Sequence, residues 1–374
     1  MKNSAIVIGA GIVGLATARA LALKGYKVRI IEKNQRAVGA SIRNFGMVWP
    51  VGQPSGKLYD RAMRSRSIWQ EISDSGAFWH DAVGSIHLAY HPDEWLVLQE
   101  LYEIFKEDRN IRLLNPSQVY EKSPAAVSEG CLGGLFSADE VIVDPRKAIG
   151  SLPEYLQEKF AITFDWHTAV QAVKDTSVIT ASGDIIKADL VVVCNGADFE
   201  LLFPEIFASL PITKCKLQMM RMKAQPDNWR IGPALCGGLS LAHYKSFEAA
   251  PSLATVKKRF SETMKEYMDW GIHVMVSQNQ TGELTVGDSH EYGLTPDPFD
   301  REKINSLILD YLMEFTRFKD NSIIETWNGV YPKLTNGGTE ILLNPSSGVY
   351  ILNGLGGAGM TLSFGLAEET VAGF

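Results

Sequence analysis

The sequence predicts an α/β domain with a mainly parallel sheet, interleaved with an α+β domain that contains an antiparallel sheet. Short apolar runs rich in β-branched residues, typical of buried parallel strands, occur near both ends and in the middle of the chain, at 4–8, 188–194 and 348–352. More amphipathic stretches, typical of antiparallel strands, lie between them. The chain has 374 residues, of which 45% are hydrophobic, and a chain of this size usually divides into more than one domain.

Composition and charge argue against several classes of partner. The formal net charge is −7 and no long basic run occurs, so we expect neither nucleic acid nor an anionic membrane surface as a partner. Residues 1–4 lead into an apolar run that ends at Gly9, which is too short for a signal peptide or a membrane span. We therefore expect a cytoplasmic protein without membrane insertion. Its cysteines form no CxxC pair, which predicts reduced thiols and no metal site; they are Cys131, Cys194, Cys215 and Cys236.

The first segment of the chain predicts a βαβ unit. Residues 4–8 have the pattern of a buried strand, and 9–14 form a glycine-rich turn. A helical pattern follows at 12–24 and stops at Gly25, a residue type that commonly ends helices. Residues 26–32 make the second strand. Such a unit requires a parallel sheet with a right-handed crossover.

The remaining elements follow from shorter periodic patterns. Asp144 and Pro145 are typical of an N-cap followed by proline, so a helix is expected from there to Phe160. Ser182 and Gly183 indicate a turn within a hairpin-rich segment at 168–187. Further helices are expected at 58–75, 92–106, 252–270 and 299–318 and from about 361 onward. Further strands are expected at 84–89, 134–143, 188–194, 211–222, 234–242, 272–277, 283–288 and 348–352.

Gly9, Gly11 and Gly14 form a G-x-G-x-x-G motif directly after the first strand and at the start of the first helix. The first glycine permits the turn, the second lets the backbone approach a pyrophosphate, and the third allows helix and strand to pack closely. The helix N-terminus offers N–H groups and the positive end of its dipole to phosphates. Glu32 ends the second strand, where a carboxylate accepts a ribose hydroxyl. The unit is therefore predicted to be Rossmann-type and to bind an adenine dinucleotide. Glu32 disfavours NADP, and the motif alone leaves FAD and NAD open.

Three further segments carry a family resemblance. They are Gly39-Ala40-Ser41-Ile42-Arg43-Asn44-Phe45-Gly46, Trp327-Asn328-Gly329-Val330-Tyr331-Pro332 and Asn353-Gly354-Leu355-Gly356-Gly357-Ala358-Gly359-Met360-Thr361. In this order, after an N-terminal βαβ unit, they resemble the D-amino acid oxidase superfamily, which includes glycine oxidase, sarcosine oxidase and D-amino acid dehydrogenases. The resemblance covers nearly the whole chain and implies FAD as the cofactor.

The resemblance also implies where FAD is held. Ser41, Arg43 and Asn44 would line the pyrophosphate and ribityl part, Val170 would meet the adenine through its backbone, and 356–361 would lie against the flavin ring. A helix N-terminus at 356–361 would also stabilise the negative charge of a reduced flavin. We expect non-covalent attachment, because the segments that carry the linking cysteine or histidine in some relatives contain neither. The predicted FAD-binding residues are Gly9, Gly11, Gly14, Glu32, Lys33, Ser41, Arg43, Asn44, Gly46, Val170, Asn195, Gly196, Gly356, Gly357, Ala358, Gly359, Met360 and Thr361.

The sequence departs from the family at Tyr331. Amino acid oxidases of this type carry an arginine in the matching segment, and its planar fork pairs with the substrate carboxylate. A phenol donates one hydrogen bond and holds no charge. The substrate is therefore expected to lack an α-carboxylate or to present its anion elsewhere.

Residues 41–54 and 287–292 resemble a subgroup associated with breakdown of aminophosphonates, such as 2-aminoethylphosphonate and its N-alkyl forms. A phosphonate would fit the missing arginine because it needs several donors. The candidate donors are Lys333, His243, Tyr244, Lys216 and His290. The predicted substrate-binding residues are Trp49, Gln53, His243 and Lys333, and Tyr331 and His290 are predicted to polarise or position the substrate as catalytic residues.

The predicted function is FAD-dependent oxidation of the C–N bond of a small amine, by transfer of a hydride to flavin N5 and hydrolysis of the imine. Dioxygen or another acceptor would re-oxidise the flavin. The alternatives are a glycine, sarcosine or D-amino acid oxidase or dehydrogenase, an NAD-dependent dehydrogenase, and a non-catalytic flavin-binding protein. The predicted FAD-binding domain comprises 1–80, 140–205 and 325–374, and the predicted substrate domain comprises 81–139 and 206–324.

Overall fold

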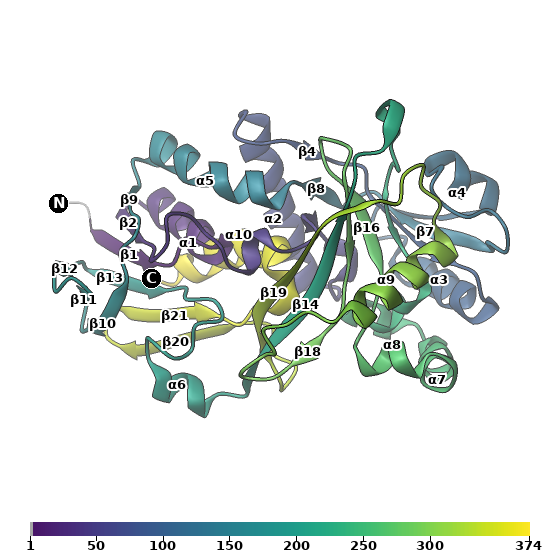
Figure 1. Ribbon diagram of the computed structural model, residues 1–374. Helices are drawn as coiled ribbons and strands as arrows, with labels where there is room; N and C mark the ends of the chain where they lie inside the picture. Colours follow the sequence, from purple (N-terminus) through teal and green to yellow (C-terminus); the bar gives the residue numbers. More distant parts are fainter. Residues whose placement is uncertain (1–2) are drawn as a thin grey trace.

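The computed structural model describes residues 3–374. Residues 1 and 2, which belong to the predicted segment 1–80 and to the start considered for a signal peptide, lie outside the described residues. Two large sheets lie side by side and are joined by long strands that run between them (Figure 1).

The first sheet has six strands and is parallel except at one edge. Its strands come from the beginning, the middle and the end of the chain, as the three apolar runs predicted. The strand at the edge, β20, pairs antiparallel with its neighbour. The order is β20 (Ile341–Ser346), β21 (Val349–Asn353), β13 (Leu190–Val193), β1 (Ser4–Ile8), β2 (Lys27–Ile31) and β9 (Thr163–Asp165).

Side chains of this sheet alternate between two cores. Val7 and Val192 pack on one face with the helices, whereas Ile8 and Val193 belong to a separate core on the other face. The helices are α1 (Ile12–Leu23), α2 (Lys57–Asp74), α5 (Pro145–Phe160) and α10 (Gly359–Ala372). The other face is covered by a small sheet of β10 (Val170–Lys174), β11 (Ser177–Thr180) and β12 (Ile185–Lys187), together with α6 (Pro204–Ser209). The predicted N-cap Asp144 is confirmed, because its carboxylate accepts hydrogen bonds from the first N–H groups of α5.

The second large sheet has nine strands and is mainly antiparallel. Its order is β18 (Glu291–Tyr292), β14 (Ile212–Met222), β17 (Leu284–Gly287), β16 (Met275–Gln278), β15 (Ala234–Cys236), β5 (Ser85–Ala89), β7 (Gly133–Ser137) and β6 (Ile111–Leu114), and β19 (Ile323–Leu334) also pairs with β14. Around it lie α3 (Pro92–Phe105), α4 (Pro116–Lys122), α7 (Leu253–Thr263), α8 (Lys265–Asp269) and α9 (Glu302–Phe315). A short sheet of β3 (Met47–Val48), β8 (Val141–Val143) and β4 (His80–Asp81) contributes residues to the cores of both large sheets.

Three predicted elements were wrong in extent. The strand expected at 134–143 is β7 and β8, because the chain changes sheet between them. The strand expected at 234–242 ends at Cys236 and continues as the 3-10 helix η4 (Gly238–Ala242). Here the backbone passes so close to a packed helix that a Cβ on Gly237 would lie 2.7 Å from the Phe315 ring. The helix expected at 252–270 is broken at Met264, which has φ −127 and ψ 37.

β19 was not predicted, and it bears on the domain division. It pairs with β14 from Ile212–Leu334 to Met222–Ile323, so the expected boundary at 325 falls inside a strand of the antiparallel sheet. β14 and β19 form the long ribbon between the two halves of the molecule in Figure 1. The division at 80, 140 and 205 stays a prediction.

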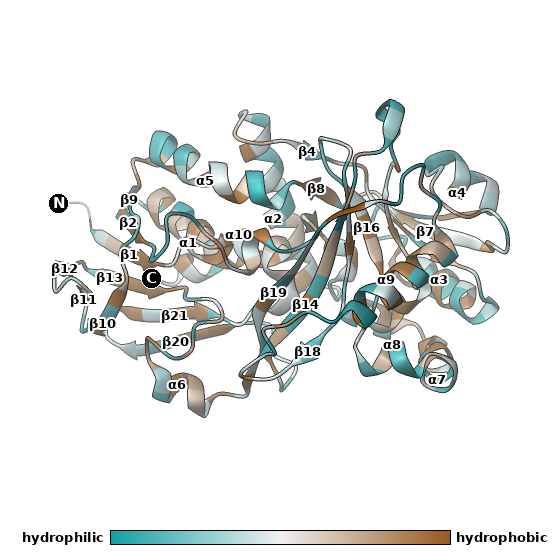
Figure 2. Cartoon of the chain, in the orientation of Figure 1, coloured by the Kyte–Doolittle hydropathy of each residue, from teal (hydrophilic) through white to brown (hydrophobic). Residues whose placement is uncertain are grey.

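Hydrophobic residues gather on the two large sheets and on the helix sides that cover them, whereas hydrophilic residues gather on the outer helices and loops (Figure 2). Among residues 3–374, no helix combines the length and the apolar content that a bilayer span requires.

Candidate active site

A cavity of about 590 Å³ lies between the two sheets, at the carboxyl ends of β1, β2, β13 and β21. In open parallel sheets this edge is the usual place for a ligand. Every residue predicted for the site lines this cavity except Gly14 and Gly46. The predicted donor Lys216 is not there: it is buried, its ammonium pairs with Asp300 at 3.1 Å, and it does not line the cavity.

The glycine motif brings backbone atoms into contact. Gly9 has φ +106, and a Cβ on it would lie 2.4 Å from the Cys194 carbonyl oxygen. A Cβ on Gly14 would lie 1.9 Å from the Gly9 carbonyl oxygen. Gly14 therefore allows α1 to pack against the turn, and this explains why it supports the site without lining the cavity.

Glu32 is buried beside this turn. Its carboxylate accepts hydrogen bonds from the backbone N–H of Ala10 at 3.0 Å and from the backbone and side-chain N–H groups of Asn34 at 3.0 and 2.9 Å. These bonds orient the carboxylate and leave it further lone pairs for a ribose hydroxyl. The neighbouring Lys33 forms an ion pair with Asp198 at 2.5 Å, which joins the ends of β2 and β13.

The loop after β2 closes over the start of α1. The Ser41 hydroxyl accepts a hydrogen bond from the backbone N–H of Ile12 at 2.9 Å. The Asn44 side-chain oxygen Oδ1 accepts a hydrogen bond from the backbone N–H of Gly46 at 2.8 Å. Gly46 has φ +73, and a Cβ there would lie 2.0 Å from the Val143 carbonyl oxygen. Gly46 is therefore required for the loop to pack on β8 rather than for direct contact with a ligand.

The C-terminal glycine loop forms the opposite wall of the cavity. It contains the 3-10 helix η6 (Gly356–Ala358) and leads directly into α10. The Thr361 hydroxyl accepts a hydrogen bond from the backbone N–H of Trp49 at 3.0 Å. The Asn353 side-chain amide donates to the Asn195 side-chain oxygen Oδ1 and to the Gly196 backbone carbonyl, both at 2.9 Å. The loop is therefore tied to two other parts of the cavity wall.

These features fit FAD. Gly9 and Gly11 line the cavity without a side chain, and the α1 N-terminus and the buried Glu32 offer donors and an acceptor for a pyrophosphate and a ribose. The cavity continues from Glu32 to the glycine loop, where the α10 N-terminus would favour the negative charge of a reduced flavin.

Tyr331 and Lys333 stand on β19 next to the glycine loop. A Cβ on Gly357 would lie 3.5 Å from the Tyr331 hydroxyl, and a Cβ on Gly356 would lie 3.7 Å from Cδ of Lys333. Burial raises the pKa of the Tyr331 phenol well above its usual range, so it remains a neutral donor.

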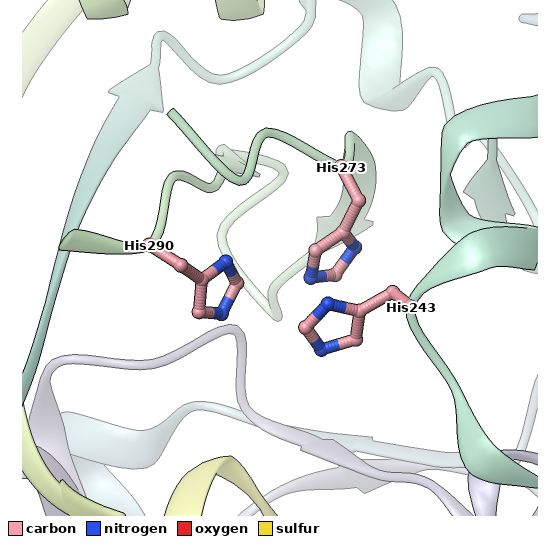
Figure 3. Close-up of side chains that lie close together, drawn as sticks. All are labelled: His243, His273 and His290. Atoms are coloured by element: carbon pink, nitrogen blue, oxygen red, sulfur yellow. The ribbon is translucent and has the colours of Figure 1, made fainter. Parts of the chain in front are cut away.

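Three histidines meet at the same end of the cavity (Figure 3). Ring nitrogens of His243, His273 and His290 lie within 4.8 Å of one another. The His243 and His273 rings stack with centroids 3.7 Å apart. Asp288 lies beside them, with carboxylate oxygens 3.0 Å from His273 Nε2 and 3.9 Å from His290 Nε2. His243 and His290 were predicted, whereas His273 and Asp288 were missed.

His243 and His290 bind a proton less readily than an exposed histidine does. Burial lowers the pKa of His290, and the nearby Asp288 offsets part of that effect. His243 keeps exposed surface because it lines the cavity, but protein surrounds the rest of its ring. This low hydration, together with His273 and His290, lowers its pKa well below the usual range. Both rings are therefore neutral near pH 7.

Trp49 and Gln53 belong to a loop of the cavity wall, residues 49–53, which we call the wall loop and which is hydrogen-bonded to buried side chains on the side away from the cavity. It contains the 3-10 helix η2 (Pro50–Gly52). Arg109 donates to the Val51 and Gln53 carbonyl oxygens at 3.2 and 2.9 Å. Glu140 accepts from the Val51 backbone N–H at 2.9 Å. Burial raises the pKa of Glu140 to about 7.

Fold and site together define an oxidoreductase built around an adenine dinucleotide cofactor. The chain belongs to the FAD dependent oxidoreductase family (DAO), whose sequence pattern matches residues 4–372. The resemblance to the D-amino acid oxidase superfamily is thereby confirmed, and so is FAD as the cofactor. Non-covalent attachment stays a prediction.

Known proteins share the fold at low sequence identity. The chain is similar to glycine oxidase from Bacillus cereus, with a TM-score of 0.78 and 17% identity over 99% of this chain and 94% of that one. It is also similar to L-proline dehydrogenase from P. horikoshii, with a TM-score of 0.78 and 20% identity over 99% and 92% of the two chains. In sequence it is 25% identical over 257 residues to the tRNA 5-methylaminomethyl-2-thiouridine biosynthesis bifunctional protein MnmC of Chromobacterium violaceum, covering 63% of this chain. The match spans 36% of that relative's length.

Proposed function

We propose that this chain oxidises the C–N bond of a small amine that carries a phosphonate group, with N-methyl-2-aminoethylphosphonate as the representative substrate. FAD, when bound, supplies the two-electron acceptor for a hydride from the carbon next to nitrogen. The protein's own residues bind the anion, orient the amine and exclude water.

The supporting observation is the set of donors at the glycine-loop end of the cavity. Among the described residues that line the cavity, Arg43 is the one arginine, and its guanidinium already donates to the Asn328 carbonyl oxygen at 3.1 Å. No second guanidinium among these residues could bind a carboxylate with two parallel hydrogen bonds. The donors that line this end instead are single ones, the Lys333 ammonium and the Tyr331 hydroxyl, whereas the Tyr244 hydroxyl already donates to Met275 Sδ at 3.1 Å. A phosphonate has three oxygens in a tetrahedral arrangement and suits several separate donors.

The pocket also suits the neutral form of an amine. Trp49, Tyr244 and Met275 line it with apolar surface. His87 lies behind them, fully buried, and its ring is packed edge-on against Phe247. Poor hydration disfavours a charged ammonium, and an amine must be neutral before its carbon can lose a hydride.

An oxidase or dehydrogenase of α-amino carboxylates is the second candidate. It is favoured by the names of the proteins that share the fold, glycine oxidase and L-proline dehydrogenase. In that case Lys333 would pair with the carboxylate as a single charge.

Bleaching of the flavin without oxygen separates these candidates. The holoprotein is mixed anaerobically with N-methyl-2-aminoethylphosphonate, 2-aminoethylphosphonate, glycine, sarcosine and D-alanine, and the absorbance near 450 nm is followed. We expect the phosphonates to bleach the flavin at concentrations at which the carboxylates do not. Bleaching by the carboxylates alone would support the second candidate. Dithionite bleaching with no response to any amine would indicate a non-catalytic flavin-binding protein.

A further inference from the structure

The hydrogen bonds around His290 define which of its nitrogens carries a proton. Nδ1 lies 2.8 Å from the Gly271 carbonyl oxygen, which can only accept. Nδ1 must therefore carry the hydrogen, and in the neutral ring Nε2 carries a lone pair. His290 is buried and lines the cavity, and Figure 3 shows its ring facing those of His243 and His273.

This lone pair has a carboxylate beside it. Asp288 Oδ2 lies 3.9 Å from His290 Nε2, and Asp288 is itself buried. A lone pair and a carboxylate that face each other across a small gap attract a group with N–H donors or positive charge. In an amine oxidoreductase the substrate itself is such a group.

We propose that His290 Nε2 accepts a proton from the ammonium group of the substrate and that Asp288 stabilises the imidazolium that forms. The proposal rests on the proposed function. One N–H bond of the ammonium breaks, its electron pair stays on nitrogen, and the proton bonds to the Nε2 lone pair. The freed nitrogen lone pair is the one that forms the C=N bond of the iminium ion when the hydride leaves carbon. The imidazolium returns its proton to water after the product has left.

A metal ion is the competing explanation for three clustered histidines, and the ring geometry opposes it. Ligand lone pairs must converge on one metal within the ring planes. His243 and His273 instead stack with an interplanar angle of 26°, so their in-plane lone pairs cannot converge on one ion without rotation of a ring. Lys333 is close enough to lower the pKa of both His243 and His290. Its positive charge would also repel a metal ion, whereas a substrate ammonium can lose its charge by giving up a proton.

The surroundings set the direction of the proton transfer. In water an amine with a pKa near 10 would give its proton to imidazole only with an equilibrium constant of about 10⁻⁴. Burial penalises the His290 imidazolium as well as the ammonium in the pocket, and Asp288 offsets part of this penalty for the imidazolium. The transfer need only be transient, because oxidation consumes the neutral amine. The ionisable groups and aromatic rings that face His290 are Asp288, His273, His243, Lys333 and Tyr292.

The test compares pH profiles of His290→Gln and the wild-type holoprotein, using anaerobic stopped-flow bleaching by N-methyl-2-aminoethylphosphonate from pH 6.5 to 10. Glutamine cannot take the proton. We expect the limiting rate to fall about 100-fold at pH 7 and less than about threefold at pH 10, where about half of the free amine is already neutral. Asp288→Asn should also lose more rate at pH 7 than at pH 10, with a smaller loss than His290→Gln. This second variant tests the proposal if His290→Gln does not fold. His80→Gln, which changes a histidine outside the cavity, is the matched control and should keep the wild-type profile.

A second readout does not depend on turnover. The compound 2-amino-2-methylpropylphosphonate has no hydrogen on the carbon that bears nitrogen, so it binds without being oxidised. By calorimetry we expect its Kd for the wild type to change less than about threefold between pH 7 and 9. In His290→Gln the Kd should rise about tenfold for each pH unit below the amine's pKa, because only neutral amine binds.

Three results would overturn the assignment. One is an equal rate loss in His290→Gln at every pH, which indicates a structural role. Another is parallel binding profiles in variant and wild type. The third is one tightly bound metal ion per chain that is lost in His290→Gln. Failure of every amine to bleach the wild-type flavin would instead refute the proposed function.

Discussion

Glu140 provides a test of how the wall loop is held, through the pH dependence of stability. It is fully buried, accepts a hydrogen bond from the Val51 N–H at 2.9 Å and lies 3.0 Å from the Ser85 hydroxyl. Its pKa is raised from 4.5 to about 7, with burial as the main cause. The folded protein therefore holds this proton more tightly than the unfolded chain does.

The sign follows from this difference. Stability from the bound proton is fully present below about pH 4.5 and is lost as the pH rises through about 7. A shift of this size lowers the free energy of unfolding by about 2–3 kcal/mol between pH 5 and pH 8. Glutamine at position 140 keeps an acceptor for Val51 and a donor for Ser85 but does not titrate. Glu140→Gln should therefore lose about 2–3 kcal/mol less than the wild type over this range.

Urea unfolding at pH 5 and pH 8, with FAD at the same excess throughout, gives the change in unfolding free energy between the two pH values. The comparison is of this change in Glu140→Gln with the change in the wild type. Glu129→Gln, which removes an exposed carboxylate, should keep the wild-type pH dependence. Equal pH dependence in Glu140→Gln and wild type would refute the reasoning, because it would mean that the buried carboxyl titrates as it does in the unfolded chain.

Three other substitutions test separate parts of the site. Gly14→Ala introduces a Cβ 1.9 Å from the Gly9 carbonyl oxygen, so the purified variant should contain almost no FAD by its absorbance ratio at 450 and 280 nm. Gly150→Ala is the matched control, because a Cβ there in α5 meets nothing within 4 Å. This variant should keep its FAD and gain about 0.5–1 kcal/mol of stability. A Gly14→Ala protein that carries the full amount of FAD would contradict the packing argument. Arg109→Met removes the donors to two wall-loop carbonyl oxygens and should lower the free energy of unfolding in urea by about 2–4 kcal/mol. A loss under about 0.5 kcal/mol would show that the loop keeps its conformation without Arg109. Tyr331→Phe should raise the Kd for an aminophosphonate at least about tenfold in bleaching titrations, and an unchanged Kd would remove Tyr331 from the anion site.

The cofactor half of the fold was predictable because its signals are local. The βαβ unit is one continuous segment in which strand, glycine turn, helix and Glu32 each carry their own pattern. Asp144 was predictable for the same reason, because a cap acts only on the helix that follows it. Tertiary packing did not need to be known for any of these.

β19 was missed because its sequence contains signals that oppose a strand. Asn328-Gly329 is typical of a turn, and Pro332 lacks an N–H for pairing. The strand forms nevertheless, because it pairs with β14 along its whole length and Tyr331 becomes buried against Cys215. Pairing between segments about one hundred residues apart leaves no local pattern to detect.

The histidine cluster shows the same limit within the site. His273 and Asp288 are adjacent because β16 and β17 pair in register, and their backbones exchange hydrogen bonds of 3.2 and 2.9 Å. His243 arrives from a different segment after η4. Single histidines on polar stretches are usually unremarkable, so only His243 and His290 were singled out, and their joint environment with Asp288 was not.

The dependence of the crevice on β21 and α10 has a consequence for biosynthesis. The wall formed by Asn353 and the loop before α10 is translated more than three hundred residues after the dinucleotide cradle. At about 5–20 residues per second, this delay amounts to tens of seconds. A nascent chain must therefore keep an unfinished crevice soluble during that time, and the cofactor site is complete only after this wall has been translated.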